Sequence, residues 1–125
     1  MTCTEQLITP IVYISGPMSN YPYYNQALFE LGERFARHLG WEVVNPHTKD
    51  VDEGVTVCPV GTPLSDDHYN ERLKADLSAI DHCDAIWMLP GWPESRGANI
   101  ELGHARNTGK KVFLVSPTDL RSCAE

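Results

Sequence analysis

The sequence predicts an α/β domain with a flavodoxin-like or Rossmann-like parallel sheet of about four to five strands and helices on both faces. Three observations predict this fold. Short apolar runs alternate with segments of helical periodicity, which is typical of parallel β-α-β units. The 125 residues suffice for one core and leave no room for a second. The chain has no internal repeat and no low-complexity tract. We therefore expect a single domain over residues 1–125, with its core at about 11–116.

The first part of the chain predicts a strand, a helix and a second strand. Residues 11–15 form a continuous apolar run that Gly16 and Pro17 end, which is typical of a buried parallel strand. Residues 41–44 form a second strand. Between the two strands, apolar side chains recur at helical spacing and predict an amphipathic helix that ends near Gly40: Tyr24, Leu28, Leu31, Phe35 and Leu39.

The second part begins with a segment of no clear periodicity. Residues 47–66 contain several glycines and prolines and predict a long loop, a feature that is often functional. A helix is then expected at about 67–80, with an apolar stripe formed by Leu73, Leu77 and Ile80. The remaining elements are a strand, a helix and a strand, expected at 85–89, 97–108 and 111–115. After Pro117 we expect only a short polar tail.

The composition argues against several classes of function. The net charge is −7, from 17 acidic and 10 basic residues, which disfavours a nucleic-acid polymer as partner but not a single nucleotide. No apolar run reaches 18 residues and the first residues lack a signal-peptide pattern, so no membrane span or leader is expected. The four cysteines form no C-x-x-C motif, which favours reduced thiols and a cytoplasmic location. His and Cys show no metal-ligand spacing, so we expect neither a metal nor another cofactor.

Two carboxylates fall on helix stripes that should face the core. Glu101 lies between Ala98 and Ala105 on one face of its helix, and Asp76 shares the stripe of the preceding helix. A buried, unpaired charge costs several kcal/mol, on the order-of-magnitude scale, so each carboxylate needs a partner or a task. Both helices flank the strand at 85–89, so the two groups could meet near its carboxyl end, where ligands bind in such folds. The alternative is that each one caps the sheet edge structurally.

Other residues at the same edge have two interpretations each. Ser95 stands at the expected start of a helix, where free amides and the helix dipole suit an anion, although it could be a plain N-cap. Trp92 and the tyrosines at 21, 23 and 24 could stack on a base or simply pack the loops. The chain has no Walker A, Rossmann glycine or G-x-S-x-G motif.

Three motifs resemble a known superfamily. Residues 13–18 read YISGPM, residues 74–77 read KADL, and residues 95–105 read SRGANIELGHA. In this order and context they resemble the nucleoside 2-deoxyribosyltransferase superfamily, over roughly residues 11–116. The chain is most similar to a small phage and bacterial branch of unknown function that is related to 2′-deoxynucleoside 5′-monophosphate N-glycosidases.

The resemblance implies a reaction at a glycosidic bond and a role for each matching residue. Glu101 would attack C1′ of a 2′-deoxyribosyl group to form a covalent intermediate, Asp76 would assist the leaving base, and Tyr13 would hold the Glu101 carboxylate by a hydrogen bond. Ser95 stands where nucleoside transferases carry Asp, which favours a 5′-monophosphate substrate. The implied substrate-binding residues are Ser15, Gly16, Pro17, Met18, Trp92, Ser95, Arg96, Gly97 and Asn99.

The resemblance leaves the acceptor open, since either water or a second base could attack the intermediate. It also implies a homodimer or higher homo-oligomer. Three alternatives remain at this point: a transferase for unphosphorylated nucleosides, a catalytically silent module that binds a nucleotide, and an interaction protein with a vestigial pocket.

Overall fold

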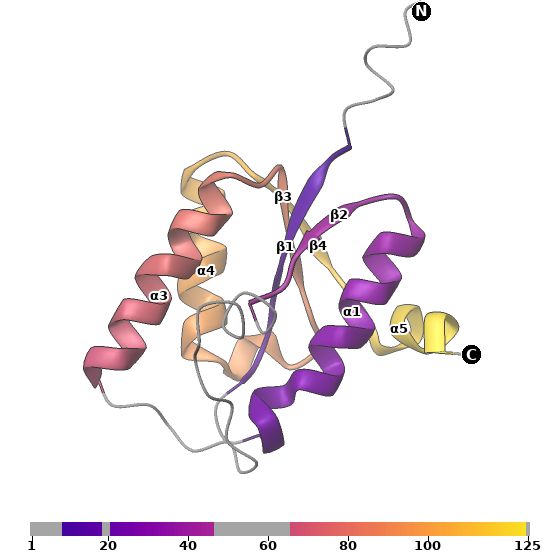
Figure 1. The fold of residues 1–125 in the computed structure, drawn as a ribbon, viewed down its shortest axis with the longest axis horizontal. Helices are drawn as coiled ribbons and strands as arrows, with labels where there is room; N and C mark the ends of the chain where they lie inside the picture. The colour runs from indigo at the N-terminus through magenta and orange to yellow at the C-terminus, as the bar shows by residue number, and fades with distance from the viewer. Residues whose placement is uncertain (1–8, 19–20, 47–65, 125) are drawn as a thin grey trace, which may run out of the picture.

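The structure of the chain is a computed structural model, which describes residues 9–18, 21–46 and 66–124 (Figure 1). Almost all of the loop expected at 47–66 therefore lies outside the described residues, and residue 66 begins a helix. Within the described ranges, no helix combines the length and the apolar character that crossing a membrane requires.

Among the described residues, four strands form one parallel sheet in the order β2-β1-β3-β4. Their bounds are Ile11–Ser15 for β1, Glu42–Val44 for β2, Ala85–Met88 for β3 and Lys111–Leu114 for β4. The register pairs Tyr13 with Ile86 and Ser15 with Met88, so β1 and β3 lie side by side in the middle of the sheet. The parallel α/β fold that the sequence predicts is confirmed.

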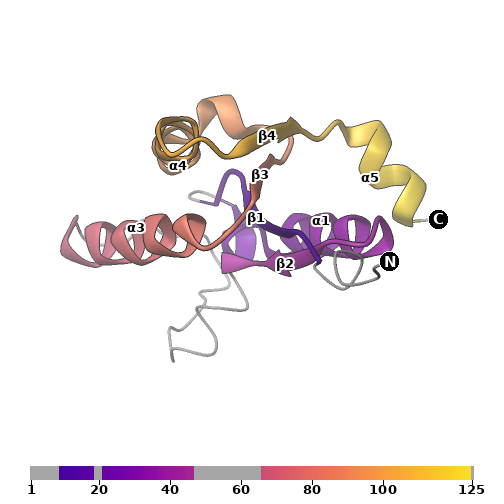
Figure 2. The same cartoon turned by 90° about the horizontal axis from the view of Figure 1, so that it is seen from above.

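Helices cover both faces of the sheet, with α1 and α5 on one side and α3 and α4 on the other (Figures 1 and 2). The α-helices in the described part of the chain are α1 (Gln26–His38), α3 (Asp66–Asp81), α4 (Arg96–Asn107) and α5 (Pro117–Ala124). Two short 3-10 turns, η2 (Pro22–Asn25) and η3 (Trp92–Glu94), precede α1 and α4.

The expected polar tail after residue 117 is wrong, because α5 is a helix that packs on the core. The Asp119 amide donates to the Ser116 hydroxyl at 3.1 Å, and the Ser116 amide donates to the Asp119 carboxylate at 3.0 Å. This reciprocal cap satisfies amides at the start of the helix. Pro117 suits the first helical position, and Leu120, only 2% exposed, attaches the helix to the core.

Two apolar layers follow from the alternation of side chains along the central strands. Val12 and Ile14 of β1 point to the α1 and α5 side, where they join Phe29 and Trp87. Tyr13 points to the opposite side, into a layer that α3 and α4 complete. Because Ser15 is two residues further along β1, its side chain shares the face of Tyr13. The fold thus directs two hydroxyl groups from one strand toward α3 and α4.

A close approach between α1 and the end of β3 depends on a glycine. A Cβ atom added at Gly32 would lie 2.8 Å from Cδ2 of Leu89 and 3.7 Å from Cδ1 of Ile14. Leu89 and Ile14 are fully buried, so they have little room to retreat. Gly103 of α4 is the contrasting case, because a Cβ added there meets no described atom within 4 Å.

We expect Gly32→Ala to lower the free energy of unfolding by about 1–2 kcal/mol, because overpacking at Leu89 outweighs the better helix propensity of alanine. Gly103→Ala is the matched control, and it should raise stability by up to about 1 kcal/mol. Urea denaturation of both variants measures the two changes. Equal stabilisation by both substitutions would show that the core at Leu89 is not tightly packed.

Candidate active site

Two buried carboxyl groups meet on the α3 and α4 side of the sheet. Asp76 of α3 is 6% exposed and Glu101 of α4 is 7% exposed. Glu101 shares its helix face with Ala98 and Ala105, which are buried against the sheet as their spacing predicts. Asp76 lies close enough to affect the ionisation of Glu101 by its charge and by a hydrogen bond. The two side chains therefore lie close together, as the sequence predicts.

Each oxygen of the Glu101 carboxyl group accepts a hydrogen bond from β1. The Tyr13 hydroxyl donates to Oε2 at 3.1 Å, and the Ser15 hydroxyl donates to Oε1 at 2.6 Å. Tyr13 is fully buried and Ser15 is 1% exposed. The hydrogen bond from Tyr13 is the contact that the superfamily resemblance implies. The resemblance places Ser15 among substrate-binding residues, but the structure directs its hydroxyl to Glu101.

Burial raises the pKa of Glu101 from its usual 4.5 to about 8. Removal from water is the largest cause, the negative charge of Asp76 is the second, and a hydrogen bond with Asp76 acts in the same direction. The hydrogen bonds from Ser15 and Tyr13 lower the pKa and oppose these effects. Because two interacting carboxyl groups titrate together, the high value describes the pair, which retains one proton at neutral pH.

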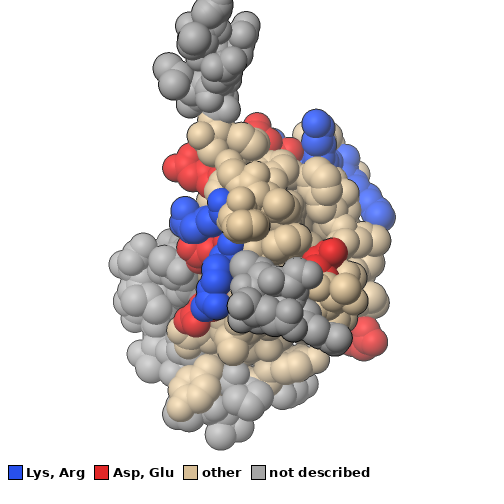
Figure 3. Space-filling view, turned by 90° about the vertical axis from the view of Figure 1, so that its right-hand side faces the viewer, with Lys and Arg blue, Asp and Glu red and all other residues tan. Residues whose placement is uncertain are grey.

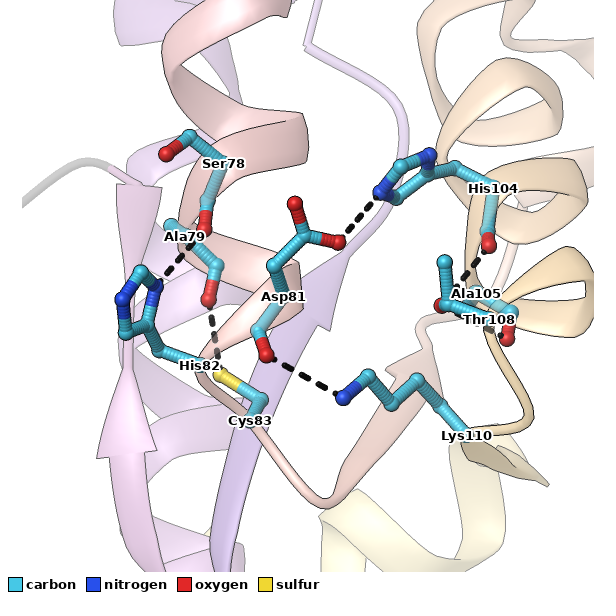
Figure 4. Close-up of polar contacts among 9 residues, drawn as sticks. All are labelled: Ser78, Ala79, Asp81, His82, Cys83, His104, Ala105, Thr108 and Lys110. Carbon is cyan, nitrogen blue, oxygen red and sulfur yellow. Dashed lines mark hydrogen bonds and ion pairs between the residues drawn. The ribbon is translucent and has the colours of Figure 1, made fainter.

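A polar contact ties α3 and α4 together about one helical turn beyond the carboxyl pair (Figure 4). Nε2 of His104 lies 2.7 Å from Oδ1 of Asp81. The Lys110 ammonium group, which follows α4, donates to the Asp81 carbonyl oxygen at 3.1 Å. His104 is three residues after Glu101 and Asp81 is five after Asp76. The contact therefore links the two helices that carry the carboxyl groups.

The start of α4 has the N-cap at Ser95 that was one of the two interpretations of the sequence. The Ser95 hydroxyl caps the helix by accepting from the Ala98 amide at 3.2 Å. Arg96 is exposed beside it and Gly97 is half-buried. A serine hydroxyl that accepts one hydrogen bond keeps its own hydrogen available for an anion. The Asn99 side chain instead donates to the Ser95 carbonyl oxygen at 2.8 Å and to the Pro93 carbonyl oxygen at 3.1 Å, so it holds η3 against α4.

The loops after β1 and β3 pack on each other. A Cβ atom added at Gly16 would lie 3.0 Å from Cβ of Leu89, and one added at Gly91 would lie 3.1 Å from Cγ of Pro17. Gly91 also has a positive φ of 91°. Trp92 is half-buried against the apolar layer of α3 and α4. Gly16, Pro17 and Trp92 thus shape the edge of the site through packing, which was one of the two interpretations of Trp92.

Arg72 is a candidate that the sequence interpretation missed. Its Nη2 atom lies 3.5 Å from the sulfur of Met18, which is half-buried at the end of the β1 loop. Arg72 precedes Asp76 by four residues, so both occupy one face of α3. That spacing was the available signal, but an arginine on an otherwise polar turn is usually solvated.

The tyrosines near the β1 loop are not part of the carboxyl pair. Tyr21 and Tyr23 are exposed, and the side chain of Tyr24 is outside the described part.

The described residues contain no group of three or more His, Cys, Asp or Glu side chains that could hold a metal ion. The buried Cys83 thiol has a pKa raised to about 11, mainly by burial, so it is protonated at neutral pH.

Residues 10–114 match a protein family described as a domain of unknown function, DUF4406. The chain belongs to this family. A solved structure with a similar fold is the CMP N-glycosidase BcmB of Clostridium botulinum, with 26% sequence identity and a TM-score of 0.50. The similarity covers 83% of this chain and 66% of that chain, so this DUF4406 protein spans slightly less than two thirds of the glycosidase. No curated protein matches the sequence. Together, the family and the fold support the nucleoside 2-deoxyribosyltransferase-like superfamily.

We expect stability to fall as the pH rises from about 5 to 8. In this range the folded carboxyl pair keeps a proton that the unfolded chain has already released, so the unfolded state binds fewer protons and gains stability with pH. Glu101→Gln removes one charge of the pair, so it should flatten this dependence. At pH 8 it should raise the free energy of unfolding by on the order of 2–4 kcal/mol.

Urea denaturation at about pH 5, 6.5 and 8 measures the free energy of unfolding across the titration of the pair. Glu94→Gln is the matched control, because Glu94 is exposed in η3 and its substitution should preserve the slope of the native chain. A Glu101→Gln protein that keeps that slope would refute the buried, like-charged pair.

Proposed function

We propose that this protein cleaves or transfers the N-glycosidic bond of a 2′-deoxynucleotide, with a 5′-monophosphate favoured, through a covalent intermediate on Glu101. The observation that carries the proposal is the buried carboxyl pair of Glu101 and Asp76, with both oxygens of Glu101 held by hydroxyl groups of β1. Likeness to a CMP N-glycosidase supports chemistry at an N-glycosidic bond in general. The monophosphate preference is supported by Ser95 and Arg96 at the start of α4.

In the proposed reaction, the two carboxyl groups have different tasks. The proton that the pair shares first moves from Glu101 to Asp76, and the ionised Glu101 then forms a bond from its oxygen to C1′ as the bond from C1′ to the base nitrogen breaks. Asp76 gives its proton to the departing base, which leaves as the neutral species. Water or a second base then attacks C1′ and releases Glu101 as a carboxylate, while Asp76 takes up the proton of the attacking group. Two successive displacements at C1′ retain its configuration.

Binding of the 5′-phosphate is assigned to the first turn of α4. We propose that backbone amides of this turn and the positive end of the helix dipole attract the phosphate, and that the Ser95 hydroxyl donates a hydrogen bond to a phosphate oxygen. Arg96 adds a positive charge at the same turn. We also propose that Arg72 contributes charge to this edge from α3, since its guanidinium group lies against Met18.

The distribution of charge supports a small ligand more than an anionic polymer. On the face shown in Figure 3, the described Lys and Arg side chains are interspersed with Asp and Glu and with uncharged surface. The net charge of −7 adds a general repulsion toward polyanions. A single nucleotide can still bind, because local amides and one or two guanidinium groups suffice.

The central test is release of free base from a panel of deoxynucleosides, deoxynucleoside 5′-monophosphates and CMP, followed by chromatography. We expect release from the deoxynucleoside monophosphates and a loss of more than about a thousandfold in Glu101→Ala, because the covalent path disappears. Glu94→Ala is the matched control for loss of an exposed carboxylate and should keep full activity.

Each other result changes the assignment. Release only when a second base is present would make the protein a transferase. Turnover of nucleosides alone would exclude the phosphate preference. Tight nucleotide binding without any turnover would favour a silent binding module, and full activity in Glu101→Ala would sink the proposed mechanism.

A substitution at Ser95 tests the phosphate assignment separately. Ser95→Asp keeps an N-cap of comparable strength but places a negative charge where the phosphate would bind. We expect the KM for deoxynucleoside monophosphates to rise more than about tenfold, because repulsion replaces a charge-assisted hydrogen bond, while turnover of any accepted nucleoside is unchanged. Ser95→Thr keeps the hydroxyl and serves as control. An equal effect of Ser95→Asp on nucleosides and monophosphates would move the phosphate site elsewhere.

A further inference from the structure

The two outer strands of the described sheet differ in how they are protected against pairing with another chain. β2 and β4 are these outer strands, and no further described strand pairs with either of them (Figure 2). β2 has only three residues and begins with the exposed, charged Glu42, and both features protect an edge. β4 instead exposes two large apolar side chains, Phe113 at 40% and Leu114 at 64%. An apolar edge of this kind is typical of a strand that pairs with another chain.

The backbone groups on the outer side of β4 belong to Val112 and Leu114. The amides of Lys111 and Val115 donate to carbonyl oxygens on the β3 side, at 3.3 and 2.9 Å. In a parallel strand, alternate residues direct both their N–H and their C=O groups to the same side. Val112 and Leu114 therefore direct theirs away from β3. The outer side of β4 thus presents alternating donors and acceptors that a further strand can match.

We propose that β4 pairs antiparallel with β4 of a second copy of this chain, about a two-fold axis at Phe113, so that the two sheets become one. In this register Val112 of one copy lies opposite Leu114 of the other, and both partners of each such pair exchange their backbone hydrogen bonds. Phe113 lies opposite Phe113 of the second copy in a non-hydrogen-bonded pair, where side chains approach most closely. The superfamily resemblance implies an oligomer without naming a surface, and this inference names one.

The side chains of β4 suit such a pairing on both faces of the sheet. On the α1 and α5 side, the Phe113 ring is already held by aromatic neighbours, with ring centroids 5.7 Å from Trp41 and 6.4 Å from Trp87. A side chain that is ordered before the partner arrives loses little entropy on association. On the α3 and α4 side, Leu114 of one copy would cover Val112 of the other. Both faces of the interface are then apolar at their centre.

Charge favours a second copy in the antiparallel direction. β4 begins with the exposed Lys111, and the exposed Asp119 lies in the first turn of α5, just beyond the end of the strand. Lys111 shares the α5 side of the sheet with Phe113, since the two are two residues apart on one strand. A two-fold axis perpendicular to the sheet keeps that side continuous between copies. Antiparallel pairing therefore brings Lys111 of each copy toward Asp119 of the other, whereas parallel pairing would place lysine beside lysine.

Sedimentation equilibrium over a range of protein concentrations tests the association. We expect a dimer with a dissociation constant on the order of 10 µM, as for an interface of modest area. Leu114→Glu should raise this constant at least about tenfold, because a carboxylate would be buried opposite Val112. Leu39→Glu is the matched control, since Leu39 is 55% exposed at the end of α1 and is not part of β4. It should change the constant less than about twofold.

Leu114→Pro tests the backbone pairing separately from side-chain contacts. Proline removes an amide hydrogen on the outer side of β4 and no hydrogen bond to β3, a position where edge strands tolerate proline. The variant should therefore keep the circular dichroism spectrum of the native chain. Its dissociation constant should nevertheless rise at least about tenfold, because hydrogen bonds across the two-fold axis are lost.

Cross-linking tests the register. Under mild oxidation, Phe113→Cys should form a disulfide between copies, because Cα atoms of a non-hydrogen-bonded pair lie about 4.5 Å apart, within disulfide range. Leu114→Cys is the matched control. Position 114 of the second copy is then a diagonal neighbour at about 7–8 Å, which is beyond that range. Mass spectrometry of the non-reduced digest distinguishes these bonds from any that involve the four native cysteines.

Each outcome decides for or against the pairing, and none depends on the proposed function, because no substrate is used. A native chain that remains monomeric at about 200 µM would overturn the inference, since a dimer of the expected affinity is mostly formed there. A dimer that withstands Leu114→Glu, or that Leu39→Glu weakens as much, has its interface elsewhere. Loss of the dimer in Leu114→Glu but not in Leu114→Pro would reject strand pairing, and cross-linking at position 114 without position 113 would reject the register.

Discussion

Two like-charged groups buried at one edge of a sheet are the constraint on which the rest of this structure depends. Ionising both Asp76 and Glu101 away from water is strongly unfavourable, so the pair retains a proton and its titration shifts to high pH. Two hydroxyl groups of β1 donate to Glu101, and an exposed contact between Asp81 and His104 links α3 and α4 about one turn away. Such an arrangement lowers stability, and function is the usual reason for its presence.

The position of the pair follows from the order of the strands. In the order β2-β1-β3-β4, the chain leaves β1 toward one edge through α1 and leaves β3 toward the other edge through α4. The two connections diverge on opposite faces, and this switch point opens a crevice outside the carboxyl ends of β1 and β3. Tyr13 and Ser15 lie at the end of β1, while Ser95 begins the helix after β3. The candidate site therefore occupies the place where this topology brings separate segments together.

Much of this arrangement could be predicted from the sequence, since it depends on local patterns. Short, largely apolar runs located the four described strands, and helical spacing put Glu101 and Asp76 on core-facing stripes. The contact partner of a given side chain is harder to predict, because it depends on the register of the strands and on the placement of the helices. The Ser15 contact needs β1 and α4 in their final positions, and Arg72 reaches Met18 only through the packing of α3. The helix α5 was missed because eight residues with Leu120 as the apolar anchor give too short a pattern.

The choice of neutral donors has a chemical consequence. A guanidinium or ammonium group beside Glu101 would keep it ionised, but its full charge would lower the basicity of the carboxylate and weaken it as a nucleophile. Hydroxyl groups stabilise the charge less, so the pKa of Glu101 stays near 8 despite two hydrogen bonds. They also fix the direction of each oxygen, since Tyr13 and Ser15 are held in the buried strand β1. The carboxyl group is thereby oriented without a neighbouring cation among these donors, so once it is ionised it keeps the basicity that attack on a sugar carbon requires.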